Sequence, residues 1–132
     1  MTGLNDARLH GLNPAALDAY TRALKAVVDT CGAQTTRAPV LLVEQPPLDD
    51  YSKHEPHNRG STSAVAAYNQ RMHKVAARHW QTALVKVTDW DAWSMLASDT
   101  VHPNDLGHAT IGAAVARTHQ AASISRPSRL HD

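Results

Sequence analysis

The first regular pattern along the chain is a stripe of apolar residues at spacings of three and four. Its members are Leu17, Tyr20, Leu24, Val27 and Val28. Residues at this spacing share one face of a helix. Asn13 followed by Pro14 suits the start of that helix, because Asn is a good N-cap and Pro is tolerated in the first turn. We predict that Gly32 ends it.

Two later segments show the same helical spacing. The first predicts a helix that begins after a cap at Thr62 or Ser63. Its expected inner face consists of Val65, Tyr68, Met72, Val75, Ala76 and His79. The second segment predicts a helix from Asn104 or Asp105 to Thr118.

Two short apolar runs predict strands. Val40–Val43 is apolar throughout and is bounded by prolines on both sides, which is typical of a strand buried in a parallel sheet. Leu84–Val87 predicts a second strand. Residues 1–13 and 48–63 are predicted to be polar loops, and residues 89–93 a loop at the end of the second strand.

The order helix, strand, helix, strand, helix predicts an α/β fold with parallel strands joined by right-handed crossovers. We expect one domain over residues 1–119 and a flexible tail over residues 120–132. Two strands are too few for this architecture, since a two-stranded sheet is marginal in water. Val40–Val43 would also have an unpaired edge, so strands are expected to be missing.

Composition excludes several classes of function. The 132 residues are 42% hydrophobic and 19% charged, which is ordinary for one globular domain. Thirteen basic residues nearly balance twelve acidic ones, so we expect no nucleic acid partner. Cys31 is the one cysteine, which excludes an internal disulfide and a multi-cysteine metal site. No cofactor is indicated.

Nothing in the sequence indicates a membrane span or a leader. No apolar run approaches the roughly 20 residues that cross a bilayer. Residues 1–6 lack the basic and apolar segments of a signal peptide. We expect a cytoplasmic protein by default, although the sequence leaves the compartment open.

The strongest pattern for chemistry lies between Asp99 and His108, where the sequence is Asp-Thr-Val-His-Pro-Asn-Asp-Leu-Gly-His. Asp99 and His102 are three residues apart, so one tight turn brings the carboxylate to the imidazole Nδ1. Pro103 disfavours helical dihedrals at His102 and keeps it in the loop before the helix. This is the arrangement of a general base and its orienting acid.

A second pattern, Gly3-Leu4-Asn5-Asp6, opens the chain. Gly3 allows a sharp backbone turn at a strand end. The carboxamide of Asn5 can donate a hydrogen bond to a developing oxyanion. Each pattern alone is an ordinary turn, and their combination is the informative observation.

Together these patterns resemble the SGNH (GDSL-type) hydrolase family. The likeness extends from Gly3 to about Val115 and includes the element order, the strand that ends in Pro-Pro and the polar loop after it. The resemblance implies a flavodoxin-like three-layer α/β/α sandwich, here N-terminally incomplete. It also implies ester hydrolysis through a Ser-His-Asp set.

The resemblance implies roles for individual residues. His102 would be the general base, Asp99 its orienting acid and Asn5 the oxyanion-hole asparagine. The other matched positions have framing or structural roles: Gly3 and Asp6 beside Asn5, and Gly107 and His108 at the start of the last helix.

The family's serine nucleophile has no match in this sequence. Relative to the family plan we expect about two βαβ units, on the order of 60 residues, to be absent. The nearest similar segment, Arg59-Gly60-Ser61-Thr62-Ser63, is better explained as a Gly-Ser turn and N-cap. Ser94 and Ser98 flank the Asp-His loop without an activating base, and Cys31 shows no sign of activation.

We therefore predict an esterase or lipase-like hydrolase of SGNH type that is completed by a serine from outside the chain and acts on a small ester. A partner chain or a second copy would pair at the open edge of Val40–Val43. The alternative is a non-catalytic binding or assembly protein, either a pseudoenzyme remnant or half of a split hydrolase.

Other side chains could have chemical roles. Imidazoles and carboxylates in the 48–63 loop could hold a divalent metal ion, but a solvated loop explains them better and we predict no metal site. These residues are Asp49, Asp50, His54, Glu55 and His57. We expect His73 and His79 at surface or interface positions. Trp80, Trp90 and Trp93 could line an acyl or glycan site, although core packing is the more ordinary use of tryptophan.

Overall fold

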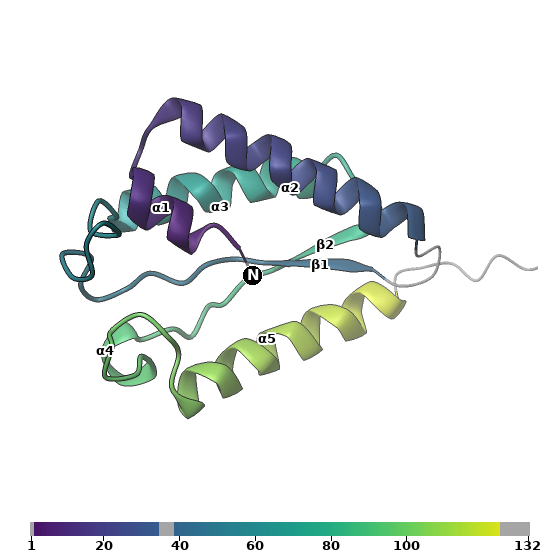
Figure 1. Ribbon diagram of the computed structural model, residues 1–132. Coiled ribbons are helices and arrows are strands. Elements are labelled where there is room, and N and C mark those ends of the chain that lie inside the picture. The colour runs from purple at the N-terminus through teal and green to yellow at the C-terminus, as the bar shows by residue number, and fades with distance from the viewer. Residues whose placement is uncertain (1, 35–38, 125–132) are drawn as a thin grey trace, which may run out of the picture.

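A computed structural model describes residues 2–34 and 39–124 (Figure 1). The elements are α1 (Leu4–His10), α2 (Pro14–Gln34), β1 (Val40–Val43), α3 (Thr62–Ala76), β2 (Thr82–Val85), α4 (Ala92–Met95) and α5 (Asp105–Ile124). Within the described residues, no helix combines the length and the apolar character needed to cross a membrane.

The two strands form a parallel pair in register from Val40 opposite Thr82 to Val43 opposite Val85. Helices α1, α2 and α3 lie on one side of this pair and α5 lies on the other (Figure 1). The prediction of an α/β fold with parallel strands is confirmed. The described residues contain two strands, which is less than the full sandwich that the resemblance implies.

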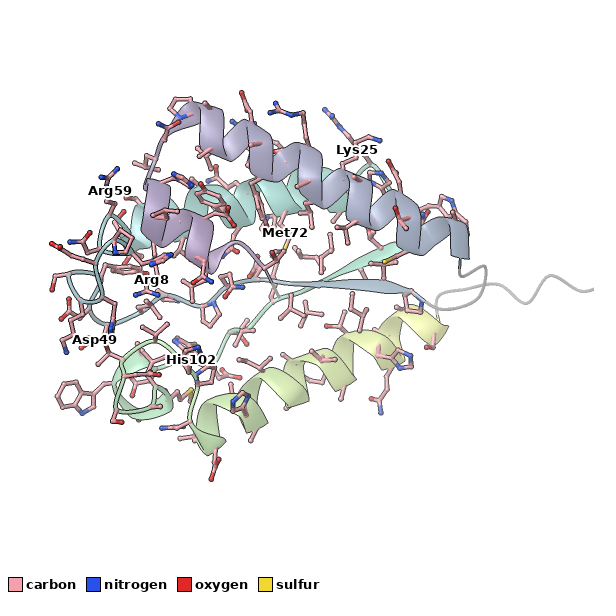
Figure 2. All side chains as sticks on the ribbon, viewed as in Figure 1. Arg8, Lys25, Asp49, Arg59, Met72 and His102 are labelled. Carbon is pink, nitrogen blue, oxygen red and sulfur yellow. The ribbon has the colours of Figure 1, made fainter. Side chains whose placement is uncertain are left out.

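Side chains of β1 alternate between two hydrophobic cores, as the pleat of a strand requires. Leu42 joins the larger core, which lies between the sheet and the helices α1, α2 and α3. Val43 faces the other side and packs with Val85 and with Ala114 of α5. The inner face predicted for α3 is confirmed for Val65, Tyr68, Met72 and Val75, which are buried (Met72 is labelled in Figure 2). Ala76 is only partly buried, and His79, predicted for the same face, lies beyond the end of the helix.

The prediction of a polar loop over residues 1–13 is wrong, because Leu4–His10 form α1. Gly3 precedes the helix with a φ of 101°, a left-handed value that glycine adopts without strain. Ala7 is fully buried in the larger core, so tertiary packing stabilises a helix that its polar sequence does not favour. A Cβ on Gly3 would lie 3.0 Å from the ring of Tyr20, which shows how closely α1 begins against α2.

Helix α2 begins as predicted and ends later. The Oδ1 of Asn13 accepts the N–H of Ala16 at 3.2 Å, which confirms the N-cap. Gly32 lies inside the helix rather than at its end. A Cβ there would lie 1.8 Å from the side chain of Gln81, so this glycine makes room for a neighbour. Val27, predicted for the buried stripe, is 57% exposed, whereas the other four members of that stripe are buried.

Helix α5 is longer than predicted, since it continues past Thr118 to Ile124. It therefore runs into the predicted tail, of which residues 125–132 lie outside the described residues. The hydroxyls of Thr118 and Ser123 donate to carbonyls one turn earlier in the helix, at 2.9 and 2.8 Å. These polar side chains are accommodated by the helix instead of ending it.

Strand β2 begins two residues earlier than predicted, at Thr82–Val85 instead of Leu84–Val87. The N–H of Val40 donates to the carbonyl of Gln81 at 2.8 Å, so pairing with β1 starts before the apolar run does. The hydrogen bonds with β1, rather than the hydropathy of its own sequence, therefore decide where β2 begins and ends.

Two other local boundaries differ from the predictions. Ser61, rather than Thr62 or Ser63, caps α3, because its Oγ accepts the N–H of Ala64 at 3.0 Å. This confirms the Gly-Ser turn and N-cap expected for that segment. The end of the predicted loop 89–93 is occupied by α4.

The cap of α3 can be tested by substitution. Ser61→Ala leaves the N–H of Ala64 without its acceptor and should lower the free energy of unfolding by about 1 kcal/mol. Thr62→Ala, at an exposed position one residue later, is the matched control and should change stability by less than about 0.5 kcal/mol. Urea denaturation followed by circular dichroism measures both, and equal effects would contradict the assignment.

Candidate active site

The turn between α4 and α5 brings the predicted acid and base together. The Oδ2 of Asp99 lies 2.7 Å from the Nδ1 of His102. The other oxygen, Oδ1, accepts the backbone N–H groups of Val101 and His102, each at 2.9 Å. Three N–H groups thus hold one carboxylate, and the predicted contact between Asp99 and His102 is confirmed.

The segment after His102 is anchored at both ends. The N–H of Ala97 donates to the carbonyl of His102 at 2.7 Å, which holds the histidine backbone against the start of the loop. The carboxamide of Asn104 donates to the carbonyls of Ser94 and Leu96 at 2.8 and 3.2 Å. Its oxygen accepts the N–H of Gly107 at 3.0 Å, which caps α5. The His-Pro-Asn sequence therefore fixes the loop and begins the helix.

Gly107 allows α5 to approach α4 closely. A Cβ at this position would lie 2.4 Å from the carbonyl oxygen of Met95 and 3.2 Å from the ring of Trp90. The contact agrees with the structural role that the family resemblance implies for Gly107.

The hydrogen bonds to Asp99 lower its pKa well below the usual range of an aspartate. The bond from the His102 ring is the largest cause, followed by those from the backbone N–H groups of His102 and Val101. An ionised Asp99 favours the tautomer of His102 that carries its proton on Nδ1. The Nε2 of His102 is then an acceptor, and the side chain is 78% exposed.

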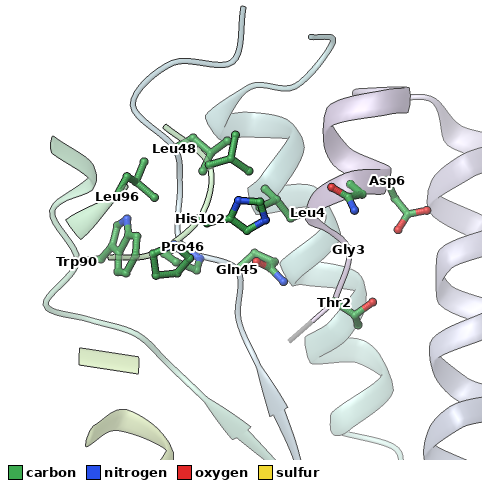
Figure 3. Close-up of a pocket in the computed structure, with 13 residues that line it drawn as sticks. Thr2, Gly3, Leu4, Asp6, Gln45, Pro46, Leu48, Trp90, Leu96 and His102 are labelled. Carbon is green, nitrogen blue, oxygen red and sulfur yellow. The ribbon is translucent and has the colours of Figure 1, made fainter. Parts of the chain in front are cut away.

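His102 and Asn5 line the same cavity of about 400 Å³. Its full lining is Thr2, Gly3, Leu4, Asn5, Asp6, Gln45, Pro46, Leu48, Trp90, Leu96, Val101, His102 and Pro103. Figure 3 shows the His102 ring between Leu4 on one side and Pro46 and Trp90 on the other. The structure thus brings Asn5, near the start of the chain, and His102, nearly 100 residues later, to one cavity. Asp99 contacts His102 but does not itself line the cavity.

The predicted frame residues lie at the start of α1. Gly3 is buried and Asn5 is exposed in the first turn of the helix. Asp6 is half-buried and also lines a second cavity of about 350 Å³ against α2. Its negative charge and, above all, burial raise the pKa of Tyr20, so that hydroxyl stays protonated.

Gln45 is a cavity residue that the sequence patterns did not single out. It follows β1 and is 7% exposed. The carboxamide of Asn69 holds its backbone, accepting the N–H of Gln45 at 3.0 Å and donating to its carbonyl at 2.8 Å. The carboxyl end of a parallel strand is the usual place for binding residues, so its position after Val40–Val43 was the available signal.

The three tryptophans have different environments. Trp90 lines the cavity and donates its Nε1–H to the carbonyl of Pro47 at 2.9 Å, which fixes the ring. Trp80 and Trp93 are 81% and 84% exposed, so the expectation of core packing is wrong for these two. Trp80 lies in the turn between α3 and β2, and Trp93 lies in α4.

The histidine and carboxylate loop shows no metal site. Among the described residues, no group of three or more His, Cys, Asp or Glu side chains is arranged to hold a metal ion. Asp50 accepts the N–H and the hydroxyl of Ser52 at 2.8 and 2.7 Å, and Glu55 accepts the carboxamide of Asn58 at 3.2 Å. Local hydrogen bonds explain these carboxylates.

No serine lines the cavity in the part of the chain that the structure describes. Ser61 caps α3, and Ser94 donates to the carboxylate of Asp91 at 2.6 Å. Ser98 and Cys31 also lie outside the cavity lining. The described cavity therefore combines the imidazole of His102, held by the Asp99 carboxylate, with the carboxamide of Asn5, and no serine lies in its described lining.

Comparison with known protein families assigns the chain to one of them. The model of the GDSL-like Lipase/Acylhydrolase family matches residues 1–110. The chain belongs to this family. The matched region includes both the Gly3-Leu4-Asn5-Asp6 segment and the Asp99–His102 turn, and membership supports a hydrolase-type function in general. Searches of the curated proteins and of the solved structures found no match.

The acid–base contact can be tested in this GDSL-like chain without any substrate. Its ionised Asp99 should give the Nδ1–H of His102 a strongly downfield proton resonance, measured by NMR on the ¹⁵N-labelled protein. Asp99→Asn should move that resonance upfield, because the charge-assisted hydrogen bond is lost. Asp91→Asn, which removes a carboxylate bonded to Ser94 instead, is the control and should leave the resonance in place.

The same resonance should persist in acid. Because folding lowers the pKa of Asp99, its contribution to stability is complete above the ordinary aspartate range and is lost only as the pH falls through the folded value. The Nδ1–H signal should therefore remain at about pH 4, where an ordinary aspartate is half protonated. Loss of the signal near pH 4 in a folded sample would contradict the lowered pKa.

Proposed function

We propose that this chain supplies the acid–base pair and one oxyanion donor of an SGNH-type carboxylic ester hydrolase. The observation that supports the proposal is that His102, held by Asp99 at 2.7 Å, shares a cavity of about 400 Å³ with Asn5. A base, its orienting acid and a carboxamide donor at one cavity are the groups that acyl transfer requires besides a nucleophile.

In the proposed reaction, the Nε2 of His102 takes the proton of a serine hydroxyl as the serine oxygen attacks the ester carbonyl. The carboxamide of Asn5 donates a hydrogen bond to the oxyanion that forms. The imidazolium then gives its proton to the leaving alcohol, and an acyl-serine remains. A water molecule, activated by the same Nε2, hydrolyses the acyl-serine and releases the acid, while Asp99 stays ionised throughout.

The serine comes from outside the described residues in this proposal, from a partner chain or a further part of the polypeptide. Among the described strands, β1 pairs with β2 alone, so its other edge is available for an added strand. A second surface that could be covered is the second cavity, which α2 and the start of α1 form and whose lining includes Ala19, Ala23 and the exposed Val27. An added strand with a helix would cover both surfaces and complete a flavodoxin-like sandwich.

The substrate in this proposal is a small ester. One wall of the cavity is apolar and consists of Pro46, Leu48, Trp90 and Leu96, which suits an acyl chain or an apolar alcohol. The rest of the lining includes the polar residues Thr2, Asn5, Asp6 and Gln45. The cavity volume of about 400 Å³ lies near the lower end of the range for small-molecule sites.

A non-catalytic binding or assembly role is the second candidate. It is favoured by one observation, the absence of a serine from the cavity lining of the described residues. In that case the β1 edge would pair with a second copy, and the protein would be a stable dimer without serine reactivity.

Labelling with a fluorophosphonate tests the source of the nucleophile. The chain is isolated with any polypeptide that binds it, treated with the probe and analysed by intact mass and peptide mapping. We expect no adduct within residues 2–124 and a serine adduct on the completing polypeptide that disappears with His102→Gln. An adduct on Ser61 or Ser94 would overturn the assignment, and a dimer without any adduct would support the assembly role.

Hydrolysis of p-nitrophenyl acetate by the isolated chain tests the base itself. Without serine, His102 can activate only water, so the rate should be weak and should fall to the background of exposed histidines with His102→Gln or Asp99→Asn. His119→Gln removes an exposed histidine of α5 and is the matched control. If the rate is unchanged in the variants of His102 and Asp99, the site is assigned wrongly.

A further inference from the structure

One contact outside the cavity joins the loop between β1 and α3 to the acid–base turn. The Nε2 of His54 lies 2.8 Å from the backbone carbonyl oxygen of Asp99, 45 residues along the chain. A carbonyl can only accept, so His54 donates, and its Nε2 must carry a proton. The loop that was considered for metal binding therefore makes a different contact, with the residue that orients His102.

The loop presents His54 from a framework of its own hydrogen bonds. The N–H of His57 donates to the carbonyl of His54 at 2.8 Å, and the N–H of Arg59 donates to the carbonyl of Arg8 in α1 at 2.9 Å. At the other end, the hydroxyl of Tyr51 accepts the N–H of Leu48 at 3.0 Å. The loop is thus ordered from α1 to the cavity, where Leu48 is a lining residue.

The backbone of His54 is itself in a costly conformation. Its φ is 68°, in the left-handed region that residues with a Cβ seldom occupy. Asn, Asp and His are the side chains that tolerate this region best among residues other than glycine. The left-handed backbone at His54 directs the imidazole to Asp99. The unfavourable backbone conformation therefore accompanies a specific long-range contact.

The contact completes the support of a single peptide group. Thr100, the residue after Asp99, also has a left-handed φ, 62°, so the peptide between Asp99 and Thr100 is unusually oriented. Its N–H, that of Thr100, donates to the carbonyl of Ala97 at 2.9 Å. Its C=O, that of Asp99, accepts from His54. Both ends of the peptide group are therefore held, one within the turn and one from the distant loop.

We propose that His54 is a positioning residue for the Asp99–His102 pair. By fixing the Asp99–Thr100 peptide, it keeps the carboxylate of Asp99 aligned with the Nδ1 of His102. It also couples the pair to the loop, since the segment that presents His54 continues into the apolar wall of the cavity. A contribution of His54 to catalysis rests on the proposed function, whereas the effect of His54 on the geometry of the Asp99–His102 pair does not.

The test measures the pair directly, by NMR of the full chain. The readouts are the exchange rate of the His102 Nδ1–H with water and the amide shift of Thr100. His54→Asn shortens the side chain beyond reach of the Asp99 carbonyl and should speed exchange about two- to fivefold, the change expected when one exposed hydrogen bond is lost. His54→Gln has a donor of similar reach and should restore the slow exchange.

His57→Asn is the matched control, because His57 lies in the same loop and its bond to the carbonyl of His54 is made by the backbone N–H, which the substitution keeps. It should leave both readouts unchanged. Equal exchange in His54→Asn and the unaltered chain, or an equal increase in His57→Asn, would overturn the proposal. No nucleophile is needed, so the His54 effect can be measured whether or not the chain hydrolyses esters. If the effect is present but the fluorophosphonate finds no serine that depends on His102, the proposed function alone is contradicted.

Discussion

The parallel pairing of β1 with β2 determines where the residues of the site lie. In a parallel pair both carboxyl ends open at the same edge of the sheet. β1 therefore delivers Gln45 and the following loop to the edge at which β2 leads to Trp90 and onward to His102. Helix α1, packed against α2 and α3, brings Asn5 to that same edge. An antiparallel pair would have sent the two connections to opposite ends.

The parts of the site that the sequence could predict are those made by neighbours along the chain. Asp99 and His102 are three residues apart, and Pro103 restricts the backbone between them and the helix, so a single turn was sufficient to place the pair. The cap at Asn13 and the inner face of α3 were predictable for the same reason, since each depends on spacing within one element. The family likeness added the expectation that Asn5 would lie near them.

The parts that could not be predicted depend on contacts between distant segments. The polar sequence of α1 indicates a loop, and only the burial of Ala7 against other helices makes it a helix. The contact from His54 to Asp99 crosses 45 residues and needs a left-handed backbone that no spacing rule indicates. Glycine is a residue type that often ends a helix, yet Gly32 lies inside α2, where the side chain of Gln81 requires space. Tertiary packing decided each of these cases.

The described residues place no serine in the cavity lining beside the Asp99–His102 pair, and this is physically coherent because the pair and the unpaired edge of β1 have separate supports. The pair is held by the hydrogen bonds of one turn, by Asn104 and by His54, none of which involves the unpaired edge of β1. In the completion that we propose, an added strand would meet an imidazole that is already oriented, and the entropy cost of assembly would be limited to docking the strand itself. Under that proposal, changes at the β1 edge should alter the fraction of molecules with a complete site, and changes in the turn should alter the activity of the completed site.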